Sequence, residues 1–181
     1  MKSRLFLHPD SIPSITGEIM VELEWGSPGQ LWLRYNADIL PAELEIPGSK
    51  DQKRADGLWQ TTCFELFLRE PGETRYYEFN FSPSRQWAAY AFEDLREGMS
   101  KLDIPKTPHI NCDLSATHFA LKVTLTLPAV LADAPLEAAL SAVIADRTGG
   151  KSYWALVHPP GKPDFHHPDC FALELAPPSA P

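Results

Sequence analysis

Apolar and polar residues alternate along much of this chain, and the pattern is clearest near its centre. Large apolar side chains occupy every second position from Phe64 to Leu68, and Glu65 lies between them. Residues 70–74 have the composition of a turn, after which the alternation resumes as far as Phe81. A period of two is typical of a strand with one buried face. The segment is therefore predicted to form a β-hairpin.

The length of the turn also predicts how the two strands of this hairpin pair. If both apolar rows face one core, Glu65 lies opposite Asn80, and Phe67 lies opposite Glu78. A carboxylate and an amide then share the face that points away from the core, and Trp59 precedes the first strand at the same end. An aromatic ring beside paired polar groups suits a sugar, whose C–H face packs on the ring while its hydroxyls reach the polar groups.

Similar alternation predicts short strands elsewhere, while only residues 93–101 and 128–137 suggest a short helical turn. The further strands are expected at residues 19–25, 31–35, 86–92, 118–127, 138–146, 153–157 and 171–175. About nine or ten short strands with little helix indicate an all-β fold, a single antiparallel β-sandwich of jelly-roll or immunoglobulin-like type. We expect one domain over residues 1–181, with its core between about residues 19 and 175.

Composition narrows the possible partners. The chain has 181 residues and a formal net charge of −8, which argues against nucleic acid or an anionic membrane as a partner. No apolar run reaches the length of a membrane span, and the N-terminus lacks the features of a signal peptide, so a cytoplasmic protein is expected. Three widely spaced cysteines form neither a metal-binding pair nor a disulfide framework.

Two connecting segments carry further candidate residues. Residues 41–57 form a long charged connection that leads into Trp59, and loops of this length are usually functional. Near the C-terminus, His158 is followed by a Pro-rich loop that contains Phe165 between polar neighbours, which indicates a contact surface. The histidines and the aspartate of this loop invite a metal, but the adjacent pair His166-His167 lacks the spacing of a chelating helix, and we assign no metal.

Known catalytic motifs are missing from the sequence, so we predict no enzyme. Glu65, Glu78 and Asp164 could meet as a paired-carboxylate site, yet nothing in the sequence sets the spacing that a glycosidase needs.

The run Trp59-Gln-Thr-Thr-Cys-Phe-Glu65-Leu-Phe-Leu, followed by Tyr76-Tyr-Glu-Phe-Asn80, resembles the signature of the DOMON-like superfamily. The similarity is greatest to the family-nine carbohydrate-binding modules, and the segment Phe165-His-His-Pro-Asp-Cys-Phe171 resembles the end of that family. The resemblance implies an antiparallel β-sandwich that clamps a sugar between Trp59 and Phe165, with Glu65 accepting from a hydroxyl.

Several family positions differ in this chain. Thr61 and Thr62 replace an acidic pair, Glu78 replaces a basic group, and Val143 and Lys162 stand where amides are expected. The candidate ligand-binding set is Trp59, Glu65, Glu78, Asn80, Asp164, Phe165 and His166, with a mono- or oligosaccharide as the ligand.

Two alternatives remain from the sequence. Other DOMON-like domains bind haem through a methionine and a histidine, which Met99 and either His158 or His166 could supply if one apolar pocket held both. The third possibility is a protein-interaction domain with a vestigial site.

Overall fold

The computed structural model describes residues 1–11, 17–27, 29–46, 51–115 and 118–177. Its helical content is one short α-helix, α1 (Ala129–Ala132), and three single turns of 3-10 helix at Pro41–Glu43, Leu58–Gln60 and Pro168–Cys170. The strands are β1 (Lys2–Leu7), β2 (Ile19–Trp25), β3 (Gln30–Ala37), β4 (Cys63–Arg69), β5 (Tyr76–Phe81), β6 (Trp87–Phe92), β7 (Ser100–Lys101), β8 (His109–Leu114), β9 (Phe119–Thr126), β10 (Leu136–Ala145), β11 (Lys151–Ala155) and β12 (Leu173–Leu175). The all-β, antiparallel fold with almost no helix is confirmed.

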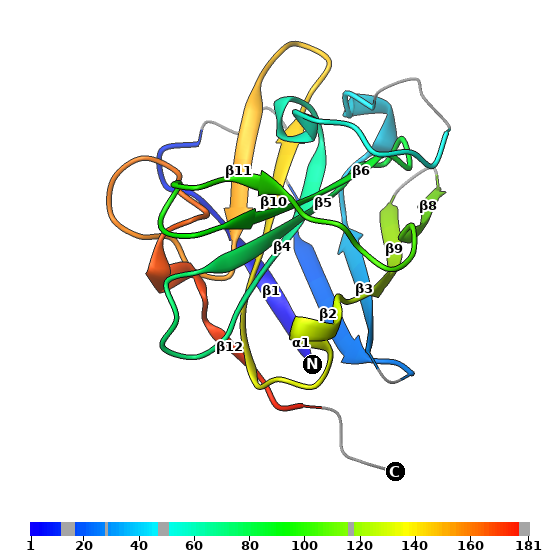
Figure 1. The fold of residues 1–181 in the computed structure, drawn as a ribbon. Helices are drawn as coiled ribbons and strands as arrows, with labels where there is room; N and C mark the ends of the chain where they lie inside the picture. The colour runs from blue at the N-terminus through cyan, green and yellow to red at the C-terminus, as the bar shows by residue number, and fades with distance from the viewer. Residues whose placement is uncertain (12–16, 28, 47–50, 116–117, 178–181) are drawn as a thin grey trace.

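The strands form one continuous sheet that curls into a half-barrel (Figure 1). Its order is β7-β6-β5-β4-β10-β11-β1-β2-β3-β9-β8, with β12 paired to β10. We call β1, β2, β3, β8 and β9 the open half, and β4–β7 with β10–β12 the covered half. In Figure 1, strands β4–β6 pass in front of β1–β3 at a steep angle. The pairing does not confirm the separate two-sheet sandwich expected from the sequence.

Strand β1 joins the two halves. Residues Lys2–Leu5 pair with β2, and the next two residues, Phe6 and Leu7, pair with β11. This strand lies before residue 19, where the sequence analysis placed the beginning of the core. It was missed because its burial pattern shows little alternation.

The central hairpin has the predicted register. Glu65 lies opposite Asn80 and Phe67 opposite Glu78. In the turn, Gly72 has a φ of 82°, a left-handed conformation that glycine adopts without steric cost.

Other strand predictions are largely confirmed, with two differences. Residues 93–101 do not form a helical turn, because a tight turn closed by an Asp94–Glu97 bridge leads into β7. Strand β8 was missed, because Ile110 is its one fully buried residue and Pro108 directly precedes it.

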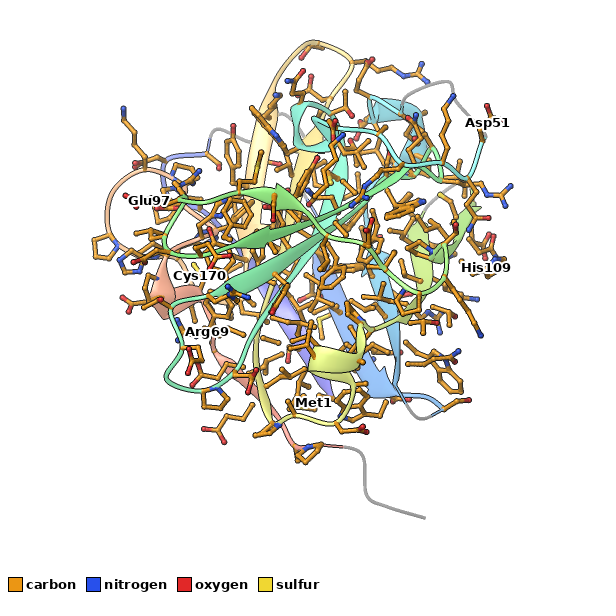
Figure 2. All side chains as sticks on the ribbon, in the orientation of Figure 1. Met1, Asp51, Arg69, Glu97, His109 and Cys170 are labelled. Atoms are coloured by element: carbon orange, nitrogen blue, oxygen red, sulfur yellow. The ribbon has the colours of Figure 1, made fainter. Side chains whose placement is uncertain are left out.

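The main core fills the space inside the curl, where Figure 2 shows densely packed side chains. The Phe64 ring of the covered half stacks on Phe119 of the open half, with ring centroids 5.3 Å apart. The hydroxyl of Tyr35 in β3 donates to the backbone oxygen of Glu65 in β4 at 2.8 Å. These contacts fix the covered half against the open half. No helix in the described residues is long and apolar enough to cross a bilayer.

Candidate functional site

The outer face of the covered half carries a cavity of about 830 Å³. Three connecting segments wall it: the one before β4, the turn between β6 and β7, and the loop after β11. It is lined by Asp56, Gly57, Trp59, Glu65, Glu78, Tyr90, Phe92, Arg96, Met99, Ser100, Lys101, Val143, Tyr153, Pro163, Phe165 and His166. In Figure 2 the labelled Glu97 and Cys170, from the second and third of these segments, lie on the same side of the molecule.

Two glutamates of the central hairpin line this cavity. Glu65 is 3% exposed and Glu78 is 6% exposed, although both belong to the row that points away from the main core. The Ser141 hydroxyl of β10 donates to Oε2 of Glu65 at 3.1 Å. The Asn80 side-chain amide donates to Oε1 of Glu78 at 2.5 Å. Each carboxyl group therefore has one oxygen held by the protein.

Burial raises the pKa of both carboxyl groups, and the charge of Glu78 adds to the shift of Glu65. Desolvation first, and the charge of Glu78 second, raise the pKa of Glu65 to about 8. Desolvation raises the pKa of Glu78 to about 6, against the opposing effects of the Asn80 hydrogen bond and the Arg96 charge. Near neutral pH, the raised pKa values therefore favour a pair of carboxyl groups that keeps one proton.

His166 lies beside Glu78 and is held by Tyr76. The Tyr76 hydroxyl accepts from the backbone N–H of Arg96 at 3.1 Å and lies 2.8 Å from Nδ1 of His166. Since the hydroxyl proton is then available to Nδ1, we assign the proton of neutral His166 to Nε2, which lies 3.9 Å from Oε2 of Glu78. Burial lowers the pKa of His166 to about 4, so the ring is neutral at physiological pH.

Asp164 does not line the cavity. Its carboxylate accepts from Nη2 of Arg96 at 2.7 Å and from the backbone N–H of His166 at 3.1 Å. Arg96 itself has a φ of 57°, unusual for a residue other than glycine. Asp164 therefore ties the C-terminal loop to the β6–β7 turn.

Trp59 and Phe165, the two residues that the resemblance assigns to the clamp, both line the cavity. Trp59 is 53% exposed, and Nζ of Lys151 lies 5.8 Å from the centre of its ring. Phe165 is only 8% exposed, with its ring 6.1 Å from that of Tyr153. Phe165 is thus not a contact surface held out on the loop, as its polar neighbours suggested, because the loop folds this side chain against Tyr153.

The rim of the cavity carries an ion pair. Asp56 accepts from Nζ of Lys101 at 2.8 Å and from the hydroxyl of Tyr90 at 2.8 Å. The connection that holds Asp56 is anchored by Arg54, whose Nη2 donates to the backbone oxygen of Leu102 at 2.7 Å. Of the long connection 41–57 highlighted by the sequence, residues 47–50 lie outside the described residues.

The sequence analysis missed several residues that line the cavity, and the strand register could have identified two of them. Tyr90 pairs with Glu78 across β5 and β6, so extending the hairpin register by one strand would have found it and Phe92. Tyr153 and Arg96 gave no such signal, because their places depend on a long-range strand pairing and on a turn.

Of the remaining candidates Asn80, Met99 and His158, only Met99 lines the cavity. Asn80 orients Glu78 from outside the lining. Met99 lines the cavity, but His158 does not, and its Nε2 lies 2.8 Å from the backbone oxygen of Phe6. Met99 and His158 are therefore not brought together for haem, whereas Met99 and His166, the other pair that the sequence allowed, both line the cavity. The described residues hold no group of three or more His, Cys, Asp or Glu side chains that could bind a metal.

Comparison with known proteins identifies the fold. The chain is similar to a putative carbohydrate-binding protein from Bacteroides uniformis ATCC 8492, with a TM-score of 0.65 and 14% identity over 94% of this chain and 83% of that one. It is also similar to a family 9 carbohydrate-binding module of Caldicellulosiruptor kristjanssonii in complex with cellotriose, with a TM-score of 0.50 and 11% identity over 87% of this chain and 74% of that one. For a family 9 carbohydrate-binding module of Caldicellulosiruptor kristjanssonii in complex with glucose, the TM-score is 0.46, at 12% identity over 87% of this chain and 76% of that one.

No protein-family model matches the chain, and no curated protein matches it. At 14% and 11% identity, the likeness to the structures with TM-scores of 0.65 and 0.50 shows a shared fold.

Proposed function

We propose that this chain is a non-catalytic carbohydrate-binding domain that holds a sugar in the cavity of the covered half. The observation that carries the proposal is the meeting of Trp59, Phe165 and two buried carboxyl groups at one cavity. The strands and loops that bring them together are far apart in the sequence. The names of the structural neighbours support the same class of ligand.

Each part of the cavity would take a different part of a sugar ring. The C–H faces of the ring pack on Trp59 and Phe165, and Glu65 and Glu78 accept hydrogen bonds from its hydroxyls. Asn80 acts indirectly, by holding one oxygen of Glu78 so that the other can face the ligand. Because each hydrogen bond replaces one with water, we expect a dissociation constant between roughly 1 µM and 1 mM.

The same arrangement makes Trp59 and Phe165 unequal partners. Trp59 is half exposed at the mouth, whereas Phe165 is buried against Tyr153. We propose that Phe165 forms a fixed wall and that Trp59 supplies the second face of the clamp. We also propose that the fold is of the family-nine β-sandwich type and that the protein is cytoplasmic.

Isothermal titration calorimetry with a panel of mono- and disaccharides tests the proposal. In Trp59→Ala, the affinity for any sugar that binds should fall by about fivefold or more, since one stacking contact is worth roughly 1 kcal/mol. Trp32→Ala is the matched control, because Trp32 is half exposed on the open half and does not line this cavity.

Equal losses in both variants would show that the sugar does not bind at the clamp. If no sugar in a broad panel binds the wild-type protein, the proposed function is wrong, and the protein-interaction alternative takes its place.

A further inference from the structure

We propose, building on the proposed function, that the preferred ligand is a sugar carrying a protonated amine, which binds between Glu65 and Glu78. The argument rests on which charges of the cavity have partners, which acceptor atoms are left over, and what surrounds them.

The cationic side chains of the cavity are already paired with acids other than these two. Lys101 donates to Asp56 at 2.8 Å, and Arg96 donates to Asp164 at 2.7 Å. Arg96 exerts a favourable charge effect on Glu65 and Glu78 but forms no ion pair with either in the described structure. The glutamate pair therefore lacks a counter-charge in direct contact, while a protein of net charge −8 would attract a cation.

Each of the two glutamates has one carboxyl oxygen to spare. Ser141 holds Oε2 of Glu65, and Asn80 holds Oε1 of Glu78. Within the described residues, no side chain or backbone group donates a hydrogen bond to the other oxygen of either carboxyl, and His166 Nε2 lies beyond hydrogen-bond distance of Glu78 at 3.9 Å. Both side chains are more than nine-tenths buried and line the cavity.

An ammonium group matches this arrangement better than a hydroxyl does. It presents three N–H donors and a positive charge, so it can reach both free oxygens and compensate both carboxylates. A neutral sugar hydroxyl donates a single hydrogen and leaves the charge of the pair uncompensated. The low exposure of the pair strengthens the attraction, because little water screens it.

Aromatic rings around the pair favour the same ligand. Tyr90, Phe92 and Tyr153 line the cavity together with the two clamp residues. The faces of such rings attract cations, and at the mouth Lys151 already lies over the ring of Trp59. The rings can therefore pack on both the sugar and its amine.

Binding of the amine should release protons. The hydrogen-bonding and charged groups near the pair include Ser141 from β10, Asn80 from β5, Arg96 from the β6–β7 turn and His166 from the C-terminal loop. The titratable side chains of Cys63 in β4, Tyr76 in β5 and Tyr90 in β6 also interact with the charges of the pair. At neutral pH, the pair holds a proton because burial and the charge of Glu78 raise the pKa of Glu65. A cation between the carboxyl groups lowers both pKa values, so the proton leaves for the buffer.

The experiment compares D-glucosamine, N-acetyl-D-glucosamine and D-glucose by calorimetry near neutral pH, in two buffers with different ionisation enthalpies. Glucosamine should bind at least about tenfold more tightly than the other two sugars, and its apparent enthalpy alone should depend on the buffer through proton release. Glu65→Gln and Glu78→Gln keep the shape of the site and should reduce this preference to about twofold or less. Glu174→Gln, on the exposed face of β12, removes the same charge elsewhere and should keep the preference.

The outcomes separate this inference from the function on which it rests. Equal binding of all three sugars at the clamp, or a glucosamine preference that survives in both glutamine variants, overturns the amine site and leaves sugar binding intact. Absence of binding by any sugar overturns the proposed function itself.

Discussion

On the open half, outward-pointing side chains of β3 such as Trp32 and Arg34 remain in solvent, whereas the outward-pointing side chains of β4 and β5 on the covered half are buried. Both halves begin with the same strand pattern, an apolar inner row alternating with a mixed outer row. The difference arises from the three connecting segments that wall the cavity, which we call the cover. These segments help to create a second apolar cluster around Phe67 and Phe171.

This contrast shows how the fold produces a site. A strand whose outer face meets water can place a polar residue there with little effect on its pKa or its hydrogen bonding. When loops cover that face, the same polar residue is desolvated and its environment becomes specific. The raised pKa values of Glu65 and Glu78 therefore depend on the cover as much as on the sheet.

The largest expected difference between the halves concerns stability. Phe67→Ala should lower the free energy of unfolding by about 3–5 kcal/mol, because Phe67 is 1% exposed and its ring packs 5.1 Å from that of His166. Trp32→Ala, also on an outer row but 50% exposed, should cost about 1 kcal/mol or less. Urea denaturation of both variants measures the contrast, and similar losses would show that the cover contributes little.

The second prediction concerns pH. The folded-state pKa of Glu65 is raised from an ordinary value of 4.5 to about 8, so the folded protein binds more protons than the unfolded chain between these values. The resulting stability is complete below about pH 4.5 and is lost as the pH rises through about 8. The free energy of unfolding should fall across this window, by at most about 1.4 kcal/mol per pH unit for one proton.

Glu65→Gln should flatten this decline in denaturation curves recorded from acid to mildly alkaline pH. Glu24→Gln, on the exposed face of β2, is the matched control and should leave the slope unchanged. A slope that is the same in wild type and Glu65→Gln would contradict the assignment.

The smallest effect is expected from Tyr76→Phe. This change removes the hydroxyl that accepts from the backbone N–H of Arg96 and contacts Nδ1 of His166, and it should lower the free energy of unfolding by about 1 kcal/mol. Tyr153→Phe is the control, since no hydrogen bond of the Tyr153 hydroxyl occurs in the described structure. Chemical denaturation compares the two variants, and equal stability would mean that water replaces the lost hydroxyl.

The sequence could predict the hairpin and its register because both depend on local rules. Alternation identified the strands, and the turn at residues 70–74 fixed Glu65 opposite Asn80. The same rules extended to β6 would have added Tyr90 to the site.

The cover could not be predicted in the same way. Arg96 and Phe165 reach the cavity through a tight turn and a loop far along the chain, and neither has a periodic pattern. Exposure was likewise misjudged for Phe165, since a loop composition gives no information about which surface the loop folds onto.

The two partners of strand β1 affect the order in which parts of the fold can form during synthesis. Its first residues can pair with β2 as soon as residue 25 is available, but Phe6 and Leu7 need β11, which begins at Lys151. Pairing of β10 with β4 also spans a long stretch of chain, as in Ser141 with Glu65. A nascent chain can therefore pair β1, β2 and β3 early, whereas the cavity must await β11 and the loop that follows it. Formation of the cavity should therefore be slow and cooperative.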